Sequence, residues 1–401
     1  MPDSQVALKI AAWTAIIGLA FLRWRSISRI FFKPEIVLLF AYAAIAGLSA
    51  LWSEVPAFSG GAAFGLFAYG ALACIVVVDL REETVIRLFV WTLVAFICAG
   101  IIGAVAAPNI TWLTGSLDES EAGTRLQGFA GHPNVFGQFA AILILMVMTA
   151  RREGFISRPI CYVILALSVA TILATGSRTA IVALLIAWGL VACRTSRFGG
   201  GVAIVILGAL AFALVLAACG ALPDIVGLFG KLSRTGRESE ILTLTGRTDL
   251  WDIAWTHILQ RPFFGWGYFG TEQLFTNSVD PMFADQAKHA HNMFLQSLIS
   301  VGFLGSLPGF AYVSLLISRF VSDPDPTRDR IILLVLVSGF GEPGIFGMPV
   351  METFFFYWIL VRETAKRLPP QGCHFEQAID FAAQPPVRPA KAFTDSMKPI
   401  R

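Results

Sequence analysis

Long apolar stretches recur from residue 5 to residue 361, separated by shorter polar segments. A helix needs about 20 apolar residues to cross a bilayer, because a backbone in lipid has to satisfy its own hydrogen bonds. Charged residues make up only 14% of the chain, too few to cover a water-soluble globule of 401 residues. We therefore predict an all-α, polytopic integral membrane protein with about 11 (10 to 12) transmembrane helices, near residues 5–22, 35–52, 61–79, 84–106, 134–150, 159–175, 178–193, 200–222, 292–318, 331–347 and 349–361.

Lysine and arginine gather in the loops that follow the odd-numbered spans, which predicts that these loops are cytoplasmic. The predicted organisation is a bundle of spans 1–8 over residues 1–222, a periplasmic loop over 223–290, spans 9–11 over 291–361, and a disordered cytoplasmic tail over 362–401. Whether the first span truly crosses the membrane stays open. The basic residues are Arg23, Arg25, Arg29, Lys33, Arg81, Arg87, Arg151, Arg152, Arg158, Arg194, Arg197, Arg319, Arg328 and Arg330.

Arg125 and Arg178 fall in the outward loops, against this bias. A charge at membrane depth costs roughly 2.5 to 3.5 kcal/mol on insertion scales, so such residues usually have a function. The alternative is an interfacial arginine that reaches lipid headgroups. Four polar motifs share that outer side: TRLQGFAGHPNVFGQ at 124–138, TGSRTA at 175–180, TGRTDLWDIAWTHILQRPFFGWGYFG at 245–270 and HAHNMFLQ at 289–296.

The third motif predicts an amphipathic helix that Thr248 or Asp249 caps and Pro262 ends. Such a helix suits a lid lying on the outer leaflet, where lipid-borne substrates arrive; packing on its own bundle is the structural alternative. Its apolar face is predicted to hold Leu250, Trp251, Ala254, Trp255 and Ile258.

The combination of GSRTA, GR-T-D-x-W closed by RP-x-x-G-x-G, and H-N-x-x-L-Q before a glycine-containing span resembles the O-antigen ligase and O-antigen polymerase superfamily, and most closely its exopolysaccharide-polymerase branch. The likeness covers roughly residues 124–350. It implies a glycosyltransferase of the bacterial inner membrane whose active site faces the periplasm and which uses undecaprenyl-diphosphate-linked oligosaccharides. In this resemblance His291 is the catalytic histidine, and Arg178 and Arg247 hold the donor diphosphate.

The chemistry also follows from the residues themselves. Arginine's planar fork matches diphosphate oxygens and stabilises the charge that grows on them as the glycosidic bond breaks, so no metal and no cofactor are expected. A histidine suits the general base that takes the proton of an acceptor hydroxyl, and direct attack inverts the anomeric carbon. We expect Arg125 to help bind the diphosphate and Asn292 to cap the ninth span. Possible further supporting residues are His289, Trp251 and Glu342, the last pairing with an arginine.

Several alternatives stay open. His289 and His291 could bind a metal together with Asp285, and His132 could line the cavity or pair with backbone. The acceptor could be another repeat unit, which makes a polymerase, or lipid A-core or another acceptor, which makes a ligase. A lipid-linked oligosaccharide flippase is the competing class, and other polysaccharide-synthesis and export proteins are possible partners beside membrane lipids. The net charge of +3 gives nucleic-acid binding no support.

Overall fold

The computed structural model describes residues 2–113, 124–195, 247–278 and 289–368. These residues are almost entirely helical, and the strands among them form one two-residue antiparallel pair, which confirms the predicted all-α polytopic class. The elements are α1 (Pro2–Leu22), α2 (Trp24–Phe31), α3 (Pro34–Leu48), η1 (Ser49–Leu51), α4 (Pro56–Asp79), α5 (Glu82–Ala106), α6 (Pro108–Thr111), β1 (Trp112–Leu113), β2 (Arg125–Leu126), α7 (Pro133–Arg152), α8 (Arg158–Thr175), α9 (Arg178–Thr195), α13 (Arg247–Gln260), α14 (Glu272–Ser278), α15 (Met293–Ser322), α16 (Pro326–Ser338), η4 (Gly344–Phe346) and α17 (Met351–Ala365).

Seven helices of the described part are long and apolar enough to cross a membrane: the pair α3 and η1, and α4, α5, α7, α8, α9 and α15. The bent pair formed by α1 and α2 would make an eighth. Helices α16 and α17 have 13 and 15 residues. The predicted span 331–347 is helical only to Ser338, because the sequence GFGEPG that follows is rich in glycine and contains proline. The predicted span 200–222, most of the predicted periplasmic loop and the tail beyond residue 368 lie outside the described residues, and the final helix runs on to Ala365, into the predicted tail.

Helix α7 lies at the centre of the bundle. It is apolar on every side and almost completely buried, and it packs against α5, α8, α9 and α16. A helix that is hydrophobic all round is stable only when other helices surround it. Because α7 is held on all sides, its N-terminal end, which begins at Pro133, is a rigid platform for polar side chains.

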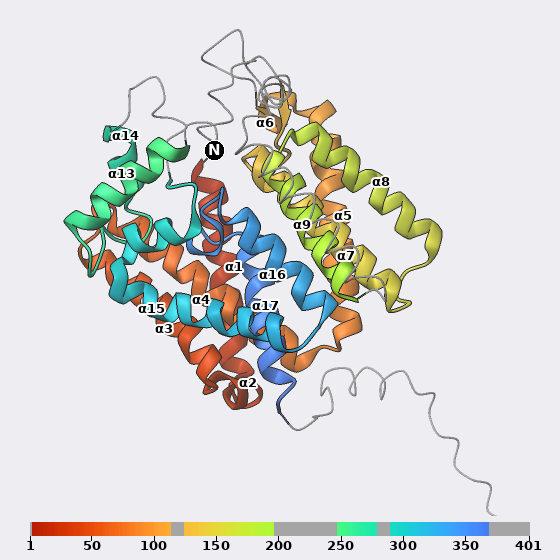
Figure 1. The fold of residues 1–401 in the computed structure, drawn as a ribbon, viewed down its shortest axis with the longest axis horizontal. Helices are drawn as coiled ribbons and strands as arrows, with labels where there is room; N and C mark the ends of the chain where they lie inside the picture. The colour runs from red at the N-terminus through yellow and green to blue at the C-terminus, as the bar shows by residue number, and fades with distance from the viewer. Residues whose placement is uncertain (1, 114–123, 196–246, 279–288, 369–401) are drawn as a thin grey trace, which may run out of the picture.

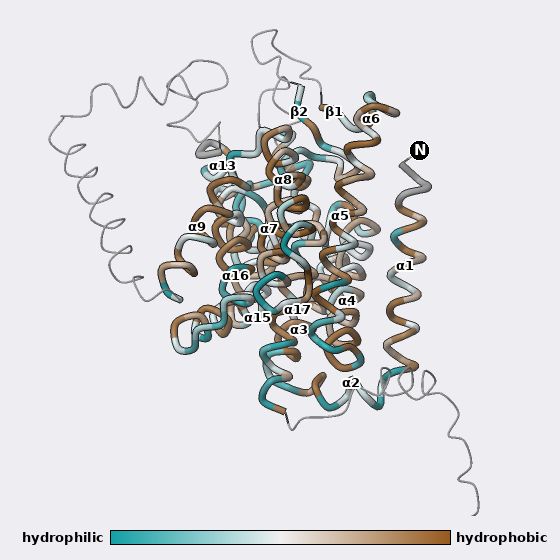
Figure 2. The backbone as a smooth tube through the Cα atoms, turned by 90° about the vertical axis from the view of Figure 1, so that its right-hand side faces the viewer, coloured by the Kyte–Doolittle hydropathy of each residue, from teal (hydrophilic) through white to brown (hydrophobic). Residues whose placement is uncertain are grey.

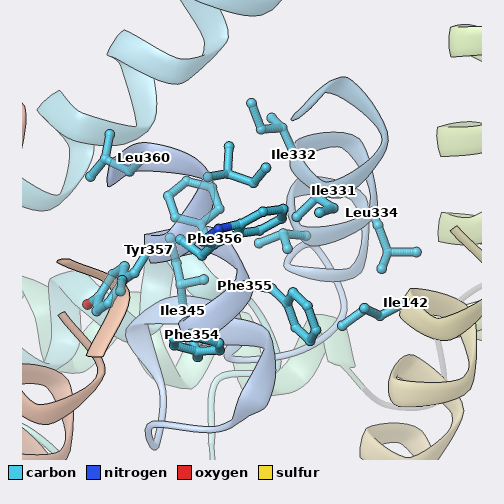
Figure 3. Close-up of a cluster of buried hydrophobic side chains, with 14 of the residues drawn as sticks. Ile142, Ile331, Ile332, Leu334, Ile345, Phe354, Phe355, Phe356, Tyr357 and Leu360 are labelled. Carbon is cyan, nitrogen blue, oxygen red and sulfur yellow. The ribbon is translucent and has the colours of Figure 1, made fainter. Parts of the chain in front are cut away.

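Helix α17 supplies the aromatic part of the core through the sequence FFFYW. Figure 3 shows Phe355 pointing toward Ile142 of α7, with Ile331 and Leu334 of α16 in the same cluster. Phe89 of α5 contacts Phe355 with ring centroids 4.7 Å apart. These contacts fix α16 and α17 against α7, so the loop between α16 and α17 has a fixed position at the end of the bundle.

The two ends of the bundle differ. Figure 1 shows α6, α13 and α14 at one end and α2 at the opposite end. In Figure 2 the long helices between these ends are coloured mostly as hydrophobic, with hydrophilic residues concentrated at α2 and near α13. Helix α2 lies across the end of α1 at an angle of 90°. We refer to the end with α13 as the outer end and to the end with α2 as the inner end, following the orientation that the sequence predicts.

An ion-pair network ties the helices together at the inner end. Asp325 contacts Arg362 at 2.9 Å and Lys366 at 2.5 Å, and Arg328 contacts Asp329 at 2.8 Å and Glu363 at 2.9 Å. Arg328 is fully buried. A buried guanidinium needs such partners, since an uncompensated buried charge is strongly destabilising.

Candidate active site

The break between α8 and α9 is built by the TGSRTA sequence. Helix α8 ends at Thr175, and Gly176 adopts φ +57°, the left-handed conformation that commonly ends a helix and that glycine adopts without penalty. Arg178 is then the first residue of α9. The interruption of the apolar run is therefore a turn between two antiparallel helices, and it places Arg178 at the outer end.

Arg125 approaches this turn from a small hairpin. Strand β2 pairs with β1, with Trp112 opposite Leu126 and Leu113 opposite Arg125. The Nε of Arg125 donates to the carbonyl of Thr175 at 2.9 Å. Sequence patterns could not reveal this hairpin, since two residues per strand carry no alternation. The sequence places Arg125 and Arg178 far apart, whereas the fold brings them to the same turn.

The N-terminus of α7 presents two polar side chains at the outer end. His132 is the N-cap residue, and its Nδ1 accepts the backbone N–H of Asn134 at 3.2 Å, so of the two predicted roles His132 takes the pairing with backbone. The Oδ1 of Asn134 accepts from Nη2 of Arg125 at 2.8 Å. Its Nδ2 donates to Oε1 of Glu342 at 2.7 Å. Asn134, which the sequence did not single out, thus joins an arginine to a carboxylate.

Glu342 lies in the loop after α16 and is 8% exposed. Its Oε2 is 3.6 Å from Nδ1 of His291. The side chain of Glu342, for which the sequence predicts an arginine partner, contacts Asn134 and His291, and Asn134 in turn accepts from Arg125. A carboxylate beside one imidazole nitrogen orients the ring and stabilises its protonated form.

The loop that carries His291 is fixed from both sides. Asn292 is the N-cap of α15, where its side chain accepts from the backbone N–H of Phe294 at 3.0 Å and of Leu295 at 3.2 Å. The N–H of Met293 donates to the carbonyl of Gly339 at 2.7 Å. His291 itself has φ +45°. A left-handed conformation at a non-glycine residue costs about 1–3 kcal/mol and persists only where the surroundings enforce it, here the cap at Asn292 and the hydrogen bond from Met293 to Gly339.

We call Arg125, Asn134, Glu342 and His291 the outer polar chain. Its members come from β2, the start of α7, the loop after α16 and the loop before α15. Each is in contact with the next, at 2.8, 2.7 and 3.6 Å along the chain. The arrangement carries a cation at one end, a carboxylate in the middle and a titratable imidazole at the other end.

The remaining predicted site residues belong to α13 and to the segment before α15. Helix α13 begins at Arg247, so Thr248 and Asp249 lie in its first turn instead of before it; the side chains of all three are outside the described residues. Trp251 is half-buried, and its Nε1 has no hydrogen-bond partner in the described part of the chain. The ring of His289 lies 5.6 Å from that of Phe269. Asp285 of the alternative metal site falls outside the described residues, and those that are described contain no group of three potential metal ligands.

The apolar face of α13 differs in part from the prediction. Ala254 and Ile258 are buried, as expected. Trp255 is 46% exposed, so it points away from this face. Residues four apart lie on one side of a helix and residues one apart do not, which explains why Ala254 and Ile258 share a face that Trp255 cannot.

A cavity of about 430 Å³ lies beside the hairpin of β1 and β2. Pro108, Asn109, Trp112 and Thr124 line it. Thr124 immediately precedes Arg125, and Trp112 pairs with Leu126 in the hairpin. The indole N–H of Trp112 donates to the carbonyl of Ala104 at 3.0 Å, which holds the ring in place.

Comparison with known families supports the resemblance. The model of the O-antigen ligase family matches residues 163–308, a segment that contains Arg178, Arg247 and His291. No curated protein matches the sequence. Lipid-linked glycans and their acceptors are the substrates that this family implies. Residues 163–308 are thus similar to the O-antigen ligase domain, which supports a membrane function of the O-antigen ligase or polymerase type for a chain whose described part has the helices of a multi-pass membrane protein.

Proposed function

We propose that this protein polymerises undecaprenyl-diphosphate-linked oligosaccharide repeats into an exopolysaccharide or O-antigen at the periplasmic face of the inner membrane. The observation that supports this most is the contact of Glu342 with Nδ1 of His291, made in a loop that is capped and strained around that histidine. It joins a base to a carboxylate at the outer end of a membrane bundle.

His291 acts as the general base. With the Nδ1 proton directed at Glu342, the Nε2 lone pair accepts the proton of an acceptor hydroxyl. The gap of 3.6 Å in the absence of substrate is ordinary for a catalytic contact, which tightens when the complex forms. Asn134 keeps the carboxylate in place by donating to its other oxygen.

The arginines bind the donor. Arg178 and Arg247 hold the diphosphate, and the charge that appears on its oxygens as the bond breaks is stabilised by their guanidinium groups. The acceptor oxygen forms a bond to the anomeric carbon, and the bond from that carbon to the diphosphate oxygen breaks. The electron pair leaves with the polyprenyl diphosphate and the proton goes to His291, so the anomeric configuration inverts and no metal enters the step.

Arg125, for which the sequence predicts diphosphate binding, lies beside Thr175 and Asn134. Its Nε and Nη2 already donate to Thr175 and Asn134. We therefore assign it to the support of Asn134 and to the compensation of the charge on Glu342. This leaves the principal contacts to the diphosphate to Arg178 and Arg247.

The test uses purified protein in nanodiscs with lipid-linked repeat units, with and without a lipid A-core acceptor. We expect products longer than one repeat without the added acceptor. We expect His291→Ala to lower the rate by about 10² to 10⁴, the usual contribution of a general base, while His374→Ala, which changes a histidine of the predicted tail, leaves it intact. Unchanged product length in His291→Ala would refute the role of His291 as the general base.

The same assay separates the alternatives. Transfer of single units to lipid A-core, without longer products, would make the protein a ligase. Movement of lipid-linked units across the membrane of vesicles that contain the protein, without new glycosidic bonds, would make it a flippase. Loss of activity with a chelator, restored by a divalent cation, would support the metal site at His289 and His291 instead of a metal-independent transfer.

A further inference from the structure

Helix α15 is interrupted within the membrane bundle. Gly302 has φ +72°, and at this point two intrahelical pairs are lost. In an unbroken helix the N–H groups of Phe303 and Leu304 would donate to the carbonyls of Ile299 and Ser300. Lipid offers no replacement partners, so a break at this depth requires that other protein groups take up all four.

The segment 261–270, which follows α13 and contains the sequence RPFFGWGYFG, supplies these partners. Its backbone lies along the break and forms one hydrogen bond with each of the four groups, so the lost pairs are fully replaced. The four hydrogen bonds are Phe303 N–H to the carbonyl of Pro262 at 2.7 Å, Leu304 N–H to Phe263 at 3.3 Å, Trp266 N–H to Ile299 at 2.9 Å and Gly267 N–H to Ser300 at 2.9 Å.

Two glycines make this approach possible. A Cβ on Gly302 would lie 2.3 Å from the carbonyl carbon of Phe263, and a Cβ on Gly265 would lie 2.6 Å from that of Ser300. Both clashes are with backbone, which cannot rotate away, and Gly265 has φ +66° as well. The turn at Gly265 is thus also a close contact between two backbones.

The same segment is attached to α13. The indole N–H of Trp266 donates to the carbonyl of His257 at 3.0 Å, and Arg261 stacks on the Trp266 ring at 3.9 Å. Ala254 and Ile258 of α13 pack in one hydrophobic cluster with residues of α15. Segment 261–270 therefore binds the C-terminal end of α13 on one side and the broken part of α15 on the other.

We propose that Gly265 and Gly302 are positioning residues that hold Arg247, at the start of α13, in a fixed place relative to His291, just before α15. This rests on the proposed function, which gives Arg247 and His291 their roles. Helix α13 has 14 residues and is about 20 Å long, so a rotation of about 5° at its clamped end moves Arg247 by about 2 Å. A misplacement of about 1 Å can lower a rate by about 100-fold.

The test combines a distance measurement with kinetics on the full chain in nanodiscs. Spin labels are placed at the exposed positions Asp252 of α13 and Leu173 of α8, in a variant whose six native cysteines are replaced. The substitutions are Gly265→Ala and Gly302→Ala. Gly61→Ala in α4 is the matched control, because nothing lies within 4 Å of its added Cβ.

We expect each of Gly265→Ala and Gly302→Ala to broaden the distance distribution and to lower kcat per folded molecule about 10- to 100-fold, with the acceptor KM unchanged within about twofold because the His291 loop keeps its own cap. Gly61→Ala should change neither quantity. A merely destabilised protein would lose folded molecules and keep its kcat. An unchanged distribution in folded variants, or a broadened one with normal kcat, would overturn the proposal.

Trp266→Phe keeps the experiment decisive if both alanine variants fail to fold. It removes only the bond from the indole to His257 and preserves the backbone pairs. We expect a broadened distribution and a lower kcat here also, and an unchanged distribution would refute the clamp. The distance between the two spin labels is measured without substrate, so it tests the positioning by Gly265 and Gly302 independently of activity. Activity that survives in His291→Ala would refute the proposed function alone.

Discussion

Oε2 of Glu342 lies 3.6 Å from Nδ1 of His291, across 51 residues of chain. His291 lies in the loop before α15, and Glu342 lies in the loop after α16. Both loops are at the outer end of the bundle. The N–H of Met293, which donates to Gly339, fastens one loop to the other. The distance between base and carboxylate is therefore set by the packing of two helices.

We predict that Glu342→Gln lowers kcat by at least about 10-fold but by less than His291→Ala, because the ring stays in place while its charged partner is lost. Glutamine keeps an oxygen that can accept from Asn134. Glu153→Gln, which changes an exposed carboxylate at the other end of α7, is the control. Steady-state rates with lipid-linked donor measure the effect, and a rate equal to that of the parent would show that Glu342 has no part in catalysis.

Asn134→Ala should both destabilise the protein and slow it. The change removes hydrogen bonds to a charged donor and to a charged acceptor, each worth about 1.5 to 3 kcal/mol, and it disconnects Arg125 from Glu342. Asn277→Ala, at an exposed position of α14, serves as the matched control. Thermal unfolding in detergent and donor turnover test this; a variant as stable and as active as Asn277→Ala would mean that the outer polar chain is dispensable.

The inner ion-pair network gives a dependence on pH. Burial alone would raise the pKa of Asp325, but the charges of Arg362 and Lys366 and the hydrogen bonds it accepts outweigh burial and hold the pKa of Asp325 below its ordinary value. A carboxyl whose pKa is lowered by folding stabilises the native state above the unfolded pKa, and this stability is lost as the pH falls through the folded pKa.

Asp325→Asn should therefore lower the thermal midpoint at neutral pH, and the difference from the parent should shrink as the pH falls below about 4. Asparagine still caps α16, so the charge is the property tested. Asp323→Asn is the control, because that side chain is 74% exposed. Midpoints measured in detergent from neutral pH down to acid decide the matter; a difference that stays constant over that range would contradict the assignment.

The orientation of the bundle can be tested with single cysteines. We expect a cysteine at Asn109, at the outer end, to react in intact cells with a maleimide that does not cross the inner membrane, once the outer membrane has been permeabilised. A cysteine at Glu153, between α7 and α8, should react only after the cells are lysed. Mass shift on a gel gives the readout, and the reverse pattern would place the proposed active site in the cytoplasm.

The sequence by itself determined the class of the molecule, and it predicts that the polar motifs share the outer side. Hydrophobic length and the bias of lysine and arginine are properties of the local chain, so they indicate spans and loops without knowledge of packing. The cap at Asn292 and the turn at Gly176 were also accessible, since both depend on a few consecutive residues.

Only the tertiary structure decided which polar groups meet. The partner of Glu342, the bridging role of Asn134 and the close approach of segment 261–270 to the break at Gly302 all join residues far apart in the chain. Helix ends that are distant in sequence come together because α7 is packed on every side and fixes the register of its neighbours. Local patterns carry no information on that register, which is set by the complementary shapes of buried side chains.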